Sequence, residues 1–145
     1  MAFVACLMAP PARSKPIQQA RDEILAETLV YLNVPYLWGG LHPRTGLDCS
    51  AFVQLVYKKT GLTLPRNSRE QFASTRYLAP GGILPGDLVF FSMKKPGSRH
   101  VDHVGIYLGK GFFVHASLTQ GIHVNHLEEP YYWQRLVSIR RYPGF

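Results

Sequence analysis

Cys49 is the residue in this sequence that is best suited to covalent chemistry. It opens a stretch running to about Lys59, in which Phe52, Val53 and Val56 follow the cysteine at helical spacing. A side chain in the first turn of a helix shares a face with the residues three, four and seven positions later. The pattern therefore predicts a thiol that points from the start of a helix toward the boundary between that helix and a sheet.

A thiol must lose its proton before it attacks, and an unperturbed cysteine is largely protonated at neutral pH. The dipole of a helix contributes at most about 2 kcal/mol, or about 1.5 pKa units, so a basic partner is also needed. Asp48 cannot be that partner, because a carboxylate beside the sulfur raises the pKa of the thiol. If Asp48 is functional, it is expected to bind a cationic group of a substrate.

Two histidines can supply the base and a residue that orients it. His103 opens the predicted strand 103–108, and His115 lies in the predicted strand 112–116, across a tight turn that begins at Gly109. In a hairpin centred on Gly109, positions 103 and 115 fall opposite each other on one face, within reach of a hydrogen bond. His103 can then take the thiol proton while His115 fixes its tautomer.

Each of these residues also has a simpler interpretation. A lone cysteine is often an inert buried residue, and single histidines are often ordinary core or surface residues. Paired histidines also bind zinc, but zinc needs three or four ligands, and strand alternation points the neighbouring Asp102 to the other face. We therefore expect no metal. The other histidines are expected at the surface: His42, His100, His123 and His126.

The composition is that of a folded chain with a basic surface. Of the 145 residues, 46% are hydrophobic and 17% are charged, which favours one globular domain over a disordered or repetitive chain. The net charge of +7 favours an anionic partner. The basic residues are dispersed and no nucleic-acid-binding motif accompanies them, so no nucleic-acid partner is expected.

The first part of the chain is expected to contain a leader and a helix. Residues 1–15 read as a flexible leader, followed by one domain over residues 16–145. Apolar residues recur at helical spacing between Ile17 and Leu32, and Pro35 ends the pattern.

The second half of the chain changes from helical to strand-like patterning. Ser68 with Gln71 resembles a capping box, which predicts a short helix to about Thr75. Helices followed by strands indicate an α+β fold, with N-terminal helices packed on a central antiparallel sheet of about five strands. The runs rich in aromatic and β-branched residues are 88–91, 103–108, 112–116, 122–126 and 136–140.

Six segments, in the same order, resemble the signatures of the NlpC-type family of papain-like peptidases, which cut peptidoglycan stem peptides. The resemblance covers about residues 17–142, nearly all of the expected domain. One visible departure is Ala51, where the family usually has glycine, and this small helix-forming residue should be tolerated. The segments are PYLWGG at 35–40, GLDCS at 46–50, LPRNS at 64–68 with Gln71, LPGDLVFF at 84–91, DHVGIYLG at 102–109 and FVHA at 113–116.

The resemblance implies a role for each residue of the site. Cys49 corresponds to the nucleophile, His103 to the base and His115 to the polar residue that orients the base. Tyr36 is expected near the thiolate, where its hydroxyl and the backbone N–H of Cys49 would bind the developing oxyanion.

Three further residues are implied as substrate-binding groups. Asp48 and Ser50 match positions that bind the amino end of the peptide in some members, and Trp38 matches an aromatic wall of the groove. The simpler alternatives are helix capping for Asp48 and Ser50 and core packing for Trp38.

The implied activity is that of a cysteine endopeptidase that acts on peptidoglycan or muropeptides, with no metal or organic cofactor. The expected bond joins γ-D-glutamate to a diamino acid and is cut through a thioester. The same three residues also fit a thiol acyltransferase or another amidase. An inactive wall-binding copy is disfavoured, because Cys49, His103 and His115 are all present.

The expected location is the cell envelope, either periplasmic or exported. Phe3-Val4-Ala5-Cys6 resembles the end of a lipoprotein signal, which makes an outer-membrane lipoprotein anchored through Cys6 one option. The basic start and the longer apolar region of such a signal are missing from this sequence. A structural disulfide between Cys6 and Cys49 is not expected, because the two residues lie in very different contexts.

Overall fold

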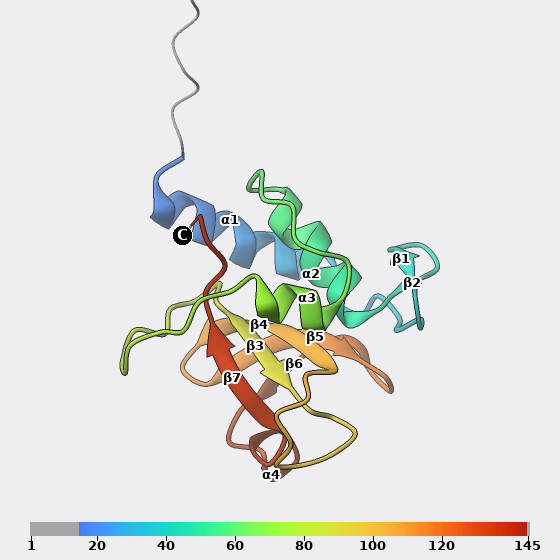
Figure 1. Ribbon diagram of the computed structural model, residues 1–145. Coiled ribbons are helices and arrows are strands. Elements are labelled where there is room, and N and C mark those ends of the chain that lie inside the picture. Colours follow the sequence, from blue (N-terminus) through green and yellow to red (C-terminus); the bar gives the residue numbers. More distant parts are fainter. Residues whose placement is uncertain (1–14, 145) are drawn as a thin grey trace, which may run out of the picture.

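The computed structural model describes residues 15–144. The predicted leader, residues 1–15, lies outside the described residues except for Lys15, and Cys6 lies outside them as well. Helices α1 (Ile17–Val30), α2 (Cys49–Lys58) and α3 (Ser68–Ala73) lie on one side of a sheet, and α4 (Pro130–Trp133) lies on the other (Figure 1). Within residues 15–144, none of the helices has the length and apolar character needed to cross a membrane.

The central sheet has five antiparallel strands in the order β6-β5-β4-β3-β7. A small separate pair, β1 (Leu41–His42) and β2 (Gly46–Leu47), precedes α2. The architecture confirms the α+β prediction, and the ends of the predicted strands agree with the structure to within one residue. The strands are β3 (Leu88–Phe91), β4 (His103–Gly109), β5 (Phe112–Ser117), β6 (Gly121–His126) and β7 (Leu136–Arg140).

Strand alternation sorts the buried residues into two cores, one on each face of the sheet. On one face, Leu88 and Phe90 of β3 pack in the core that α2 covers. On the other face, Val89 and Phe91 pack with Tyr132 of α4. The sheet is therefore covered on both faces, with the catalytic candidates near one end of it.

Helix α2 forms as its apolar spacing predicts. Phe52, Val53 and Val56 are fully buried against the sheet, and the helix begins at Cys49. Helix α1 follows its pattern only in part. Ile24 is fully buried, but Leu29 is 62% exposed, so the predicted apolar face is wider than the face that packs.

The capping box predicted for α3 is wrong in register by one residue. Asn67 is the N-cap, and its side-chain oxygen accepts a hydrogen bond from the backbone N–H of Glu70. Gln71 does not return to the cap. Its amide donates to the carbonyl oxygens of Ser50 and Pro65, which ties α3 to the start of α2.

Candidate active site

A pocket of about 580 Å³ brings together all seven residues that the sequence singled out as catalytic or substrate-binding. Its walls come from the loop before β1, the start of α2, the segment before α3, and strands β4 and β5. The seven residues are Tyr36, Trp38, Asp48, Cys49, Ser50, His103 and His115.

Cys49 is the first residue of α2, a free thiol with 9% exposure. Burial raises the pKa of the thiol to about 11, a hydrogen bond from the backbone of Val104 acts in the opposite direction, and Asp48 raises it further. The contact with Val104 places the sulfur against the start of β4, one residue after His103. A thiol with a raised pKa needs a base to remove its proton before it can attack.

The two histidines lie on one face of the β4–β5 hairpin, but they are not directly opposite each other. The register pairs His115 with Gly105, and a shift between Tyr107 and Gly109 accounts for the difference from a hairpin centred on Gly109. The displacement is an even number of residues, so His103 stays on the face of His115. The predicted register is wrong, while the predicted contact is present.

The contact between the histidines is a hydrogen bond of 2.8 Å between Nε2 of His103 and Nδ1 of His115. The two rings are perpendicular, with centroids 5.0 Å apart. Because Nε2 of His103 is engaged, Nδ1 is the ring nitrogen that remains for a thiol proton.

Glycine is required at position 105 by this arrangement of the hairpin. A Cβ atom there would lie 2.8 Å from the carbonyl oxygen of Val114 and 3.1 Å from Cβ of His115. Any larger residue would push β5 away and move the His115 ring, so the glycine leaves room for His115 beside the pocket.

Both histidines are held in the neutral form at physiological pH. Burial, and secondarily the charge of His115, lowers the pKa of His103 well below the ordinary value for histidine. Burial lowers the pKa of His115 to about 4, although its hydrogen bond with Asn125 and the charge of Glu129 act in the opposite direction. His103 is therefore unprotonated, as a general base must be before the reaction, down to a pH below the ordinary histidine pKa.

Asp48 caps α2 and also forms an ion pair. Its Oδ1 accepts from the backbone N–H of Ala51 at 2.8 Å and from the Ser50 hydroxyl at 3.1 Å. Its Oδ2 lies 2.6 Å from Nη2 of Arg66. Asp48 therefore caps α2, as the simpler alternative predicted. A substrate amine would have to share its carboxylate with Arg66.

Tyr36 and Trp38 form the wall of the pocket beside Cys49. Trp38 is 79% exposed, so core packing is not the reason for its aromatic side chain. Tyr36 is partly buried, and burial together with the charges of Cys49 and Asp48 raises the pKa of its phenol. A protonated phenol near the sulfur is a donor of the kind that an oxyanion requires.

Asp102 lines the pocket, which contradicts the expectation that alternation turns it away. It precedes β4 and therefore does not follow the alternation of the strand. Its carboxylate accepts from the backbone N–H groups of Met93 and Lys94 at 2.6 and 3.1 Å and so holds their loop. Within residues 15–144, no three His, Cys, Asp or Glu side chains are grouped in a way that could hold a metal ion.

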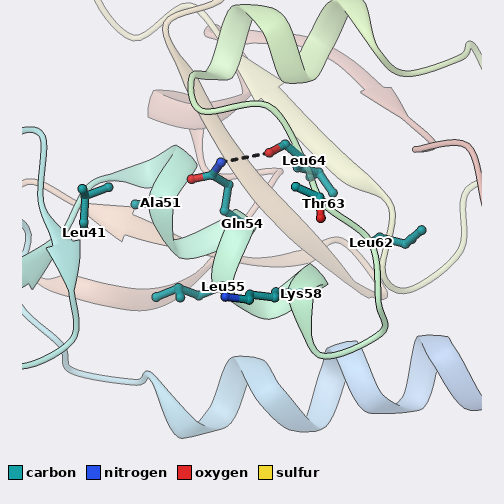
Figure 2. Close-up of a pocket in the computed structure, with 8 residues that line it drawn as sticks. All are labelled: Leu41, Ala51, Gln54, Leu55, Lys58, Leu62, Thr63 and Leu64. Atoms are coloured by element: carbon teal, nitrogen blue, oxygen red, sulfur yellow. Dashed lines mark hydrogen bonds between the residues drawn. The ribbon is translucent and has the colours of Figure 1, made fainter.

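A second cleft, of about 420 Å³, lies on the outer face of α2, as Figure 2 shows. Ala51, Leu55 and Lys58 line it from the helix, and Gln54 donates a hydrogen bond to the carbonyl oxygen of Leu64 across it. The lining holds no cysteine, histidine or carboxylate side chain. The pocket around Cys49 is therefore the better candidate for the active site.

Comparison with known proteins identifies the family of this chain. The model of the NlpC/P60 family matches residues 33–141. The chain belongs to the NlpC/P60 family. It is 38% identical over 130 residues to the bifunctional muramidase/DL-endopeptidase CwlT of Bacillus subtilis, covering 88% of this chain and 39% of the relative. It is 36% identical over 135 residues to the murein DD-endopeptidase MepH of Escherichia coli, covering 90% of this chain and 49% of the relative.

Solved structures of NlpC/P60 proteins share the fold. A Staphylococcus aureus protein of this family superposes with a TM-score of 0.77 at 32% identity, over 92% of this chain and 44% of the other. These matches confirm both the family resemblance and the fold class. The chain spans less than half the length of the two curated relatives described above, with matches that cover 39% of one and 49% of the other.

Several residues of the pocket were not singled out from the sequence as site residues. Arg66 lies within the LPRNS segment, so the family resemblance contained a signal for it. Lys94, Leu118 and Tyr131 also line the pocket, but they come from loops and from α4, where no periodic pattern marks them.

Proposed function

We propose that this NlpC/P60 chain is a cysteine endopeptidase that hydrolyses an amide bond in peptidoglycan stem peptides. The observation that carries the proposal is the common pocket of Cys49 and His103, with His103 hydrogen-bonded to His115. Relatives named as endopeptidases of DL and DD bonds support a peptidoglycan substrate.

In the first half of the reaction, Cys49 becomes acylated. The thiol proton moves to Nδ1 of His103 as Sγ attacks the carbonyl carbon of the substrate. The resulting oxyanion is bound by the backbone N–H of Cys49 and the hydroxyl of Tyr36. The C–N bond then breaks, the protonated His103 gives its proton to the leaving amine, and a thioester remains.

In the second half, water releases the acyl group. His103 takes a proton from the attacking water, the thioester C–S bond breaks, and the sulfur regains the proton from His103. The two half-reactions therefore balance in protons and bonds, with no reactant other than the substrate, these side chains and water. His115 keeps the imidazole in one orientation throughout.

The proposed bond joins γ-D-glutamate to a diamino acid. A Bacillus subtilis relative, 32% identical over 130 residues, is named a γ-D-glutamyl-L-lysine dipeptidyl-peptidase, and this name supports the choice. We propose that Asp48 and Ser50 hold the amino end of the peptide and that Trp38 packs against its backbone. Peptidoglycan lies in the cell envelope, so a periplasmic or exported location, including attachment through Cys6, belongs to the same proposal.

Digestion of defined muropeptides, followed by mass spectrometry, tests the proposed bond. We expect a fragment containing L-Ala-γ-D-Glu and a second fragment that begins with the diamino acid. Release of an intact stem peptide from the sugar would contradict the endopeptidase proposal. Transfer of the acyl group to an added amine in preference to water would favour the acyltransferase alternative.

The activity is expected to persist at mildly acidic pH. His103 must be neutral to act as a base, so kcat/KM falls as the pH drops through its pKa. Burial lowers that pKa, so the acidic limb should lie below the ordinary histidine pKa of 6.5. A pH series of kcat/KM on a muropeptide checks this, and a limb at or above 6.5 would contradict the description of His103.

A further inference from the structure

The hydrogen bonds from His103 continue beyond His115 to three residues of the β6–α4 segment. Nε2 of His115 lies 2.9 Å from Oδ1 of Asn125, and the Tyr132 hydroxyl lies 3.2 Å from the same oxygen. Nδ2 of Asn125 lies 3.3 and 3.4 Å from the two carboxylate oxygens of Glu129. The chain of contacts therefore runs from a carboxylate near the surface to the buried pair of histidines.

The carboxylate of Glu129 determines which group donates and which accepts in each of these hydrogen bonds. An ionised carboxylate can only accept hydrogen bonds, so the amide of Asn125 must turn its NH₂ group toward Glu129 and its oxygen toward His115. The oxygen also accepts from Tyr132, which favours the same orientation of the amide. His115 must then donate from Nε2, and its Nδ1 carries a lone pair.

The same order of donors and acceptors determines which ring nitrogen of His103 carries its proton. Because Nδ1 of His115 accepts, Nε2 of His103 is the protonated nitrogen of that ring, and Nδ1 of His103 is free to take the thiol proton. If the direction were reversed, Nδ1 of His103 would carry a proton and could not act as the base for Cys49. The tautomer of the base therefore depends on a residue three hydrogen bonds away.

We infer that Asn125 and Glu129 are positioning residues that set the tautomer of His103 through His115. The inference rests on the proposed function for the role of His103. It goes beyond the three catalytic candidates, because neither Asn125 nor Glu129 lines the pocket.

The surroundings hold both residues in place. Glu129 Oε1 accepts from the backbone N–H of His126 at 2.7 Å, and Tyr132 packs edge-on against His115 with ring centroids 5.3 Å apart. His115 itself is 1% exposed, so water cannot readily replace Asn125 as its acceptor. The titratable groups that face His115 are His103 from β4, His123 from β6, Glu129 from the segment before α4, and Tyr132 from α4.

Two substitutions of Asn125 separate positioning from packing. Asn125→Leu keeps the size but removes the acceptor, and we expect kcat to fall about 100-fold with KM changed less than about threefold. Asn125→Asp keeps an acceptor for His115, so it should recover most of kcat above neutral pH. Its negative charge also favours protonated His115, so the fall of kcat/KM at acidic pH should begin at a higher pH than in the wild type. A substitution that only disturbed packing would leave the pH of this fall unchanged.

The carboxylate has a matched control in the adjacent residue. Glu129→Gln removes the acceptor-only group and is expected to lower kcat/KM about fivefold, comparable to one hydrogen bond. Glu128→Gln changes a neighbouring side chain that is 87% exposed, and it should leave kcat/KM within about twofold. Equal effects of the two substitutions would overturn the role of Glu129.

Heteronuclear NMR of the histidine rings in the full chain tests the inference without activity. In the wild type we expect the proton of neutral His103 and of neutral His115 on Nε2, and a change of tautomer in Asn125→Leu. A wild-type His115 protonated on Nδ1 would overturn the inference even in an active enzyme. Wild-type protein with the expected tautomers but no muropeptide hydrolysis would instead count against the proposed function.

Discussion

The Cys49→Ala protein is expected to lose at least about 1,000-fold in kcat/KM for muropeptide hydrolysis, because no thioester can form without the sulfur. The fold should survive the change. The side chain is small and 9% exposed, and Phe52, Val53 and Val56 hold α2 on the sheet. The measurement is the initial rate of fragment release, with thermal unfolding recorded on the same preparation.

Thiol alkylation and Cys6→Ala provide the controls for this prediction. An alkylating reagent should inactivate the wild type to the same extent, while Cys6→Ala should keep its activity, because the mechanism uses one sulfur. His103→Ala should be nearly as damaging as Cys49→Ala. Activity of Cys49→Ala within tenfold of wild type would rule out the thioester mechanism.

The helix that begins at Cys49 could be predicted because its signal is local. The apolar spacing after Cys49 specifies which face of α2 is buried, and that face also carries the sulfur. The exposure of Leu29 in α1 could not be predicted in the same way. A pattern shows which face can be buried, whereas neighbouring elements determine how much of it is covered.

The contact between His103 and His115 could be predicted even though its register could not. A displacement by an even number of residues leaves both side chains on the same face, and an imidazole is long enough to reach a diagonal neighbour. The irregularity between Tyr107 and Gly109 depends on the local geometry of the turn. Alternation therefore preserved the contact between the two histidines, although the residues that pair across the hairpin differ from the prediction.

Asn125, which contacts His115 from a different strand, could not be predicted from the sequence as part of the site. Asn125 belongs to β6, and its contact with His115 requires both the β5–β6 register and the position of Glu129 before α4. A polar residue in a strand ordinarily reads as a solvent-facing position. Only the tertiary arrangement shows that this amide contacts a buried histidine.

Asp87 is the centre of a buried ion cluster on the helix side of the molecule, away from the pocket. Its side chain is 1% exposed and pairs with Arg141 at 2.8 Å and with Arg21 at 3.4 Å. It also accepts from the backbone N–H of Leu84 at 2.8 Å. The cluster joins α1, the turn before β3 and the segment after β7, which lie far apart in the sequence.

Asp87→Ala is therefore expected to cause the largest loss of stability among single substitutions of charged residues in this domain. The substitution removes the carboxylate that two largely buried guanidinium groups share as their counter-charge, which costs about 3 to 5 kcal/mol in the free energy of unfolding. For a chain of this size that corresponds to a fall of about 10 to 20 °C in Tm.

Asp22→Asn is the control, because it changes an exposed carboxylate on the same helix as Arg21 and should alter the free energy of unfolding by less than about 0.5 kcal/mol. Denaturant unfolding of both variants measures the difference, and a loss below about 1 kcal/mol for Asp87→Ala would show that the arginines find water or other partners. Arg21 is the residue through which α1 joins this cluster, so α1 should loosen first, detectable as faster hydrogen exchange in residues 17–30 than in α2.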